Sequence, residues 1–202
     1  MAGVFVRGVV HLNKRNSGSL SVQEAVQRFC QDVQTGDHSR LEPTLRAMNR
    51  LRCWAAAVEQ FAVGPSPEVD KGNALLSFWF TYGLWSIPRG LKGDLPCLVD
   101  AFRHLLPPYT GNGMILYRGE LASRHRRRIY GISWTPNLET ARRFAARRSS
   151  LHEGPGVVLR IEASASMIAV AVRDHSNHTL TLDEDEYLVD PRQLVEKVGV
   201  VF

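Results

Sequence analysis

The spacing of apolar residues changes near residue 110, and this change constrains the fold more than any other feature of the 202-residue chain. Before Pro107 and Pro108, apolar residues recur at intervals of three and four, which is helical periodicity. The helices predicted from this spacing cover residues 21–33, 41–63, 68–85 and 95–106. After Gly111, short apolar runs alternate with glycine and polar turns, a pattern typical of strands. Helices followed by strands indicate an α+β domain, because an alternating parallel sheet would interleave the two.

The second half of the chain predicts short strands with one helix among them. The candidate strands cover residues 114–117, 129–134, 157–161, 167–172, 186–189 and 195–202. Helical spacing returns over 137–148, where Leu138, Ala141 and Phe144 share one face. We therefore expect a helical lobe over 1–110 and a β-rich lobe over 111–202, joined in one compact domain.

Composition is that of an ordinary soluble globular protein, with 44% apolar and 22% charged residues. The most apolar stretch, 74–87, is shorter than the roughly 20 residues that a membrane-spanning helix needs. The apolar run at the N-terminus is too short for an export signal. The three cysteines have no pairing pattern, which fits a reducing compartment. We expect a cytoplasmic protein with no signal peptide and no membrane partner.

The net charge of +5 is unevenly distributed along the chain. Arginines gather at 124–128 and again at 142–148, both within the β-rich lobe, whereas acidic residues gather at 183–186. Concentrated positive charge favours an anionic ligand or partner.

Three short motifs in the β-rich lobe carry the candidate functional residues. In the first, a strand ends at Arg118 and Gly119. A guanidinium group offers a fixed fork of donors suited to a phosphate or a ribose, and a glycine lets a ligand approach the backbone. In the second motif, Ser133 and Thr135 lie on the same side of an extended chain, so both hydroxyl groups can face one cleft.

The third motif is the acidic run at the start of a predicted strand. Glu184 and Glu186 lie on one face of an extended chain. Acidic runs are usually solvated turns. The apolar segment 187–189 follows directly, however, and draws Glu186 toward the core.

Together the three motifs resemble the R-S-E class of mono-ADP-ribosyltransferases, which includes bacterial toxins. The resemblance covers about residues 113–201, and it implies a helical lobe followed by a mixed, mostly antiparallel β-sandwich that binds NAD. Where the family commonly has Ser-Thr-Ser, this chain has Ser133, Trp134 and Thr135.

The resemblance implies that NAD is a substrate, cleaved at its nicotinamide bond through an oxocarbenium-like state. Glu186 would stabilise that state, Ser133 would orient its carboxylate, and Thr135 would support the site. Arg118, followed by Gly119, would anchor the NAD phosphates. Glu184 would engage the acceptor and help to remove its proton.

Two aromatic residues and two arginines have open assignments. Trp134 and Phe144 either stack on nicotinamide or pack in the core, and aromatic residues more often do the latter. Arg142 and Arg143 either reach the NAD diphosphate or lie on the outer face of their helix.

The acceptor implied by the resemblance is a macromolecule. Glutamate at position 184 favours a protein arginine, and the acceptor would be recognised by the loop 173–181. This reading makes the protein a bacterial toxin or effector with an antitoxin or immunity protein as a further partner.

Other readings remain open. The arginine clusters also suit ADP-ribosylation of RNA or DNA, or a non-catalytic binding or inhibitor module on the same fold. Water can also accept the ADP-ribose. We expect no metal site, because His175 and His178 are spaced as a ligand pair but no second pair accompanies them.

Overall fold

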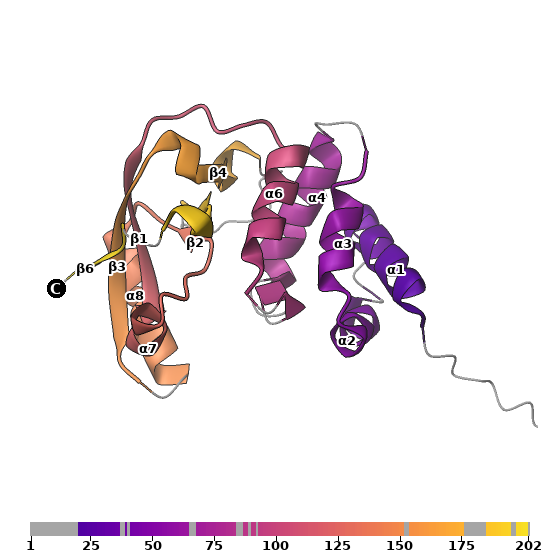
Figure 1. Ribbon diagram of the computed structural model, residues 1–202, viewed down its shortest axis with the longest axis horizontal. Coiled ribbons are helices and arrows are strands. Elements are labelled where there is room, and N and C mark those ends of the chain that lie inside the picture. The colour runs from indigo at the N-terminus through magenta and orange to yellow at the C-terminus, as the bar shows by residue number, and fades with distance from the viewer. Residues whose placement is uncertain are drawn as a thin grey trace, which may run out of the picture.

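The computed structural model describes residues 20–36, 39, 41–64, 68–83, 87, 88, 90, 91, 93–151, 154–175, 185–194 and 197–201. Figure 1 shows a helical lobe at one end of the molecule and a lobe containing the strands at the other. The helical lobe contains α1 (Val22–Thr35), α2 (Leu41–Leu51), α3 (Trp54–Phe61), α4 (Val69–Phe78), the π-helix η2 (Trp79–Gly83) and α6 (Leu95–Leu105). Among the described residues, no helix is long and apolar enough to cross a bilayer.

Helix α1 begins with a capping box. The Ser21 hydroxyl accepts a hydrogen bond from the backbone nitrogen of Glu24, and the Glu24 carboxylate accepts one from the backbone nitrogen of Ser21. The single helix predicted over 41–63 is instead two helices. Arg52 has a φ of 54°, a left-handed conformation that ends α2, and the backbone nitrogen of Cys53 donates to the Met48 carbonyl.

The helical lobe has an aromatic centre. Phe29 lies edge-on to Trp54, Phe61 and Phe78, with ring centroids 5.3, 6.0 and 5.0 Å away. All four rings are buried. Edge-to-face pairs at these separations stabilise a core beyond the area they bury.

Two small antiparallel sheets form the other lobe. The first has the order β1 (Met114–Leu121), β3 (Gly156–Ala163) and β6 (Gly199–Val201), and the second has the order β2 (Ser133–Trp134), β5 (Tyr187–Val189) and β4 (Ile168–Ala171). The lobe also contains α7 (Ala122–Arg126) and α8 (Leu138–Leu151), and η3 (Ala165–Met167), η4 (Val172–Asp174) and η5 (Pro191–Gln193) are short 3-10 turns. The fold is therefore α+β, as the spacing of apolar residues predicts.

Helix α8 lies directly against β1 and β3 (Figure 1). A Cβ atom on Gly119 would come within 2.3 Å of the Ala141 carbonyl oxygen, and one on Gly156 within 2.2 Å of the Ala145 carbonyl oxygen. The glycines are required because the helix backbone fills the space beside each strand. Gly119 thus makes room for the helix. It also borders the cavity described below, so the approach of a ligand to its backbone stays a prediction.

The two lobes share a core and are joined by ion pairs. Ile132, Val170 and Leu188 of the β-rich lobe pack in the same cluster as the helices. Asp190, which is 2% exposed, accepts from Arg103 of α6 at 2.6 Å, and Arg192 joins Asp190 to Asp100 of α6. The shared core and the ion pairs therefore hold the two lobes in one arrangement.

Candidate functional site

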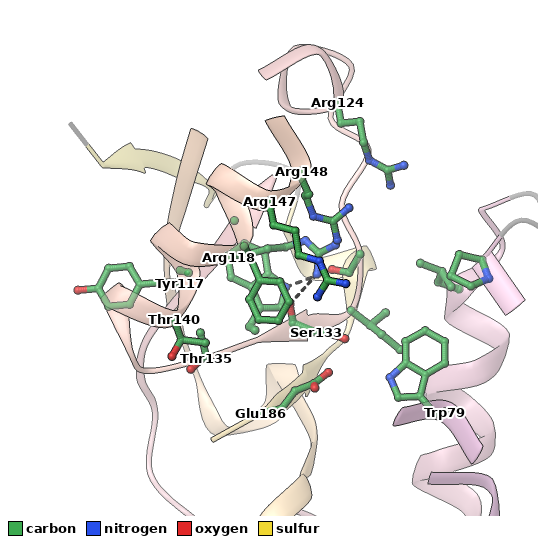
Figure 2. A pocket seen from close by; sticks show the side chains of 18 of the residues that line it. Trp79, Tyr117, Arg118, Arg124, Ser133, Thr135, Thr140, Arg147, Arg148 and Glu186 are labelled. Carbon is green, nitrogen blue, oxygen red and sulfur yellow. Dashed lines mark hydrogen bonds between the residues drawn. The ribbon is translucent and has the colours of Figure 1, made fainter. Parts of the chain in front are cut away.

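A cavity of about 260 Å³ lies between the two lobes (Figure 2). The β-rich lobe contributes residues 117–119 of β1, residues 131–135 around β2, Glu186 and one face of α8. The helical lobe contributes Trp79, Pro88 and Leu95. The cavity thus brings together Arg118, Ser133 and Glu186, which are far apart in the sequence.

The Arg118 guanidinium is held in one orientation. Its Nη1 donates to the carbonyl oxygen of Ser133 at 2.7 Å, and its Nε and Nη2 donate to Oε2 of Glu120 at 3.2 and 3.1 Å. Gly131 leaves room for this group, because a Cβ there would lie 2.4 Å from Nη2. The side chain is only 10% exposed, so Arg118 forms a fixed part of the cavity wall.

Glu120 is fully buried behind Arg118 and was not singled out by the sequence analysis. Its Oε1 accepts from the backbone nitrogen of Leu121 at 3.0 Å and lies 3.3 Å from Nε of Arg124 and 3.6 Å from Nη1 of Arg148. Burial raises the pKa of Glu120, but the three neighbouring arginines lower it more, so the pKa lies below its ordinary value. The residue is therefore ionised at neutral pH.

The second arginine cluster divides between two faces of α8. Arg142 pairs with Glu139 on the exposed side, and Arg143 donates to the Thr140 hydroxyl; neither lines the cavity. Arg147 and Arg148, one turn further on, do line it. Burial lowers the pKa of Arg148 to about 10, with repulsion from Arg118 as a further cause. Arg148 remains a cation at neutral pH.

The pairing of β2 with β5 positions Ser133 and brings Glu186, at the start of β5, to the same part of the cavity. Ser133 lies opposite Leu188, and Trp134 lies opposite Tyr187. Glu186 directly precedes β5, and its carbonyl oxygen accepts from the backbone nitrogen of Val172 at 3.0 Å. Thr135 directly follows β2 and pairs with Tyr117 of β1, and Ser133, Thr135 and Glu186 all border the cavity. Figure 2 shows Glu186 on the opposite side of the cavity from the arginines.

The Thr135 hydroxyl connects β2 to the start of α8. It accepts from the backbone nitrogen of Asn137 at 3.1 Å, while Oδ1 of Asn137 accepts from the backbone nitrogen of Thr140 at 3.0 Å. Thr135 also exchanges two backbone hydrogen bonds with Tyr117, at 2.7 and 2.9 Å. Thr135 therefore fixes the helix that carries Arg147 and Arg148.

The two aromatic candidates differ in placement. Trp134 is 1% exposed, packs in the core of the β-rich lobe with Tyr187, and donates from Nε1 to the Gly131 carbonyl at 3.2 Å. It borders the cavity only from this buried position. Phe144 is partly exposed and reaches the cavity from α8. Of these two candidates, Phe144 is therefore the one that presents an accessible ring to a ligand.

Trp79 is a cavity residue that the sequence places only within the predicted helix 68–85. It begins the π-helix η2 and is 2% exposed, and its buried Nε1 has no hydrogen-bond partner among the described residues. Short π-helical turns occur often at functional sites. An unpaired indole N–H beside a cavity is a donor for a ligand oxygen.

Glu184 lies outside the described residues, and so does most of the loop 173–181 proposed to recognise the acceptor, including His178. Within the described ranges, no group of three or more histidine, cysteine, aspartate or glutamate residues could hold a metal ion.

Charge is distributed unequally around the cavity. Arg118, Arg124, Arg147 and Arg148 border it on one side, and the carboxylate of Glu186 borders it on the other. Such an arrangement suits a ligand with an anionic part and a part that becomes positive.

Comparison of the chain with protein families, with curated proteins and with solved structures gives no match.

Proposed function

We propose that the protein is a mono-ADP-ribosyltransferase that cleaves NAD at its nicotinamide bond and transfers ADP-ribose to a macromolecule. The observation that carries the proposal is the meeting of Arg118, Ser133 and Glu186 in one cavity. These are the residues on which the resemblance to the R-S-E class depends. In this proposal, the two small antiparallel sheets correspond to the β-sandwich of that class.

The charges of the cavity match those of NAD during cleavage. The diphosphate carries two negative charges and suits the arginine side, where guanidinium groups donate charge-assisted hydrogen bonds. The ribose next to nicotinamide becomes positive as the bond breaks and suits the carboxylate side. The volume of about 260 Å³ is at the small end for ligand sites, so the cavity encloses only part of a dinucleotide.

In the proposed reaction, nicotinamide is the leaving group. As its bond to ribose breaks, the pyridine nitrogen keeps the electron pair of that bond, so that nicotinamide leaves as a neutral molecule. Glu186 stabilises the oxocarbenium ion that remains, with Ser133 beside it to orient the carboxylate. The acceptor nucleophile then bonds to the ribose carbon and gives up a proton, the step for which we propose Glu184.

The favoured acceptor is an arginine of a protein, and the resemblance suggests a toxin or effector neutralised by an antitoxin or immunity protein. A nucleic acid is the second candidate acceptor. Arg126 and Arg127 are exposed beside the cavity residue Arg124 and could hold a phosphate backbone.

The proposal is tested by incubating the purified protein with NAD labelled in its adenylate part and a bacterial lysate. Nicotinamide release and label transfer are measured with and without nuclease. The Glu186→Gln variant keeps the size of the side chain but removes its charge. We expect it to lower turnover by at least about 10²–10³-fold while ADP-ribose still binds. Glu139→Gln, an exposed change on α8, is the matched control and should act as the wild type does.

Each outcome has a distinct meaning. Label on nuclease-resistant material that disappears in Glu186→Gln supports a transferase acting on protein, and nuclease-sensitive label identifies a nucleic acid acceptor. Nicotinamide release without label identifies water as the acceptor. ADP-ribose binding with neither release nor label would overturn the catalytic proposal in favour of a binding module.

A further inference from the structure

The buried carboxylate of Glu120 is surrounded by arginines from three different elements. Arg118 lies on β1, Arg124 on α7 and Arg148 on α8, and their nearest nitrogens are 3.1, 3.3 and 3.6 Å from the carboxylate oxygens. The Glu120 side chain is 0% exposed, while all three arginines border the cavity. The carboxylate therefore stands behind the cavity wall and the guanidinium groups form the wall itself.

The single negative charge of Glu120 neutralises only part of the positive charge of Arg118, Arg124 and Arg148. Positive charges close together at a partly buried site repel one another, and this arrangement is costly unless an anion compensates it. The repulsion is visible at Arg148, whose pKa is lowered by burial and by Arg118. The excess positive charge faces the cavity, which is where an anion could approach.

The two oxygens of Glu120 have different tasks. Oε2 accepts both hydrogen bonds from the Nε and Nη2 edge of Arg118, which turns Nη1 toward Ser133. Oε1 accepts from the backbone of Leu121 and faces Arg124 and Arg148. A carboxylate fixed in this way sets the direction of one guanidinium and gathers the other two around it.

We propose that Glu120 is a positioning residue that assembles Arg118, Arg124 and Arg148 into one site for a diphosphate. A diphosphate carries two adjacent negative charges and several acceptor oxygens, so it can meet guanidinium groups from several directions at once. That the diphosphate belongs to NAD rests on the proposed function. The site itself requires only the diphosphate group, and Glu120 acts on it through the arginines without touching it.

The test measures calorimetric binding of ADP-ribose, which contains the diphosphate but cannot be cleaved at a nicotinamide bond, and of inorganic pyrophosphate. Glu120→Gln should weaken both by about 10- to 100-fold, since each lost charge-assisted contact is worth about that much. With NAD, the same variant should raise KM and leave kcat within a few-fold. A role confined to folding would instead lower the fraction of active protein and leave KM unchanged.

Because Glu120→Gln alters a buried ion cluster, variants of its partners provide an independent route. Arg124→Gln and Arg148→Gln change partly exposed side chains and should each weaken ADP-ribose binding by about tenfold. The control is Arg142→Gln, on the same helix but facing away from the cavity, which should bind normally. If Glu120 acts through Arg148, the effects of Glu120→Gln and Arg148→Gln on binding should not be additive. The variant that carries both changes should then bind ADP-ribose more tightly than the sum of the two single losses in binding free energy predicts.

The outcomes separate this inference from the transferase proposal. Arginine-dependent and Glu120-dependent binding of ADP-ribose without NAD turnover would support the diphosphate site and reject the transferase. NAD turnover with normal ADP-ribose binding in Glu120→Gln, Arg124→Gln and Arg148→Gln would overturn the inference alone. Failure of the wild-type protein to bind either ADP-ribose or pyrophosphate would also overturn it.

Discussion

Replacing Gly119 with alanine should push α8 away from β1, because the helix backbone occupies the space that a methyl group needs. The new Cβ would lie 2.3 Å from the Ala141 carbonyl oxygen and the Ala145 backbone nitrogen, and 2.8 Å from the carbonyl carbon of Phe144. Carbon–oxygen contacts are rarely closer than about 3.3 Å, so the helix must retreat by about 1 Å. All three obstructing atoms belong to the backbone, and no side-chain rotation relieves the clash.

The expected cost follows from the size of this movement. Overpacking a well-packed site costs about 1–3 kcal/mol, and a clash with backbone belongs at the upper end of that range. In a protein of this size, each kcal/mol lowers Tm by about 2–4 °C, which gives a decrease of about 5–10 °C. The same movement displaces Arg148 from Arg118, and a displacement of about 1 Å is enough to weaken a positioned site by tenfold or more.

Thermal unfolding and ADP-ribose calorimetry measure the two effects. The matched control is Gly199→Ala in β6, where the nearest atom to a new Cβ is 3.9 Å away. That variant should keep its Tm within about 2 °C of the wild type. A Gly119→Ala protein as stable as Gly199→Ala would refute the reasoning, because it would mean that α8 does not approach β1 as closely as the glycines indicate.

Three further predictions concern the interface of the lobes and the cavity. Asp190→Asn should lower the free energy of unfolding by about 1.5–3 kcal/mol in urea titrations, because it removes the charge of a buried carboxylate that pairs with two partly exposed arginines, whereas the exposed Asp100→Asn should cost less than about 1 kcal/mol. Burial raises the pKa of Asp190, but the hydrogen bonds from Arg192 and Arg103 lower it by more, so the pKa lies below its ordinary value. The wild type should therefore lose this stability as pH falls below about 4, and Asp190→Asn should lack that part of the pH dependence. Trp79→Phe should weaken ADP-ribose or NAD binding by up to about tenfold, because it removes an unpaired N–H donor beside the cavity. Trp54→Phe, which removes a donor to Asn49 at 2.7 Å, should lower stability more than Trp79→Phe does and leave binding unchanged.

The fold class could be predicted because it depends on local spacing. Helical periodicity before Pro107 and short apolar runs after Gly111 separate the two lobes without any knowledge of tertiary contacts. The break between α2 and α3 could not be predicted in this way. It occurs at Arg52, whose left-handed φ of 54° is adopted without the glycine that usually marks such an end.

The candidate site was predicted in part. Arg118, Ser133 and Glu186 could be singled out because each belongs to a short polar motif beside an apolar run, and the structure places all three around one cavity. The prediction that the first strand ends at Arg118 was wrong, because β1 continues to Leu121. Glu120 carried one available signal, its place two residues after Arg118 on the same strand and so on the same side. Trp79 carried none, because its role depends on how the helical lobe docks.

The two sides of the cavity are built by separate parts of the structure, and this has a consequence for function. The position of α8 against β1 and β3 brings Arg148 to Glu120 and Arg118, so the packing of one helix determines the arginine side of the cavity, the proposed site for the diphosphate. The pairing of β2 with β5 determines where Glu186 stands relative to Ser133. Changes in how α8 packs should therefore alter ligand affinity first, whereas changes in the β2–β5 register should alter turnover first. A site divided in this way allows its binding and its chemistry to change independently.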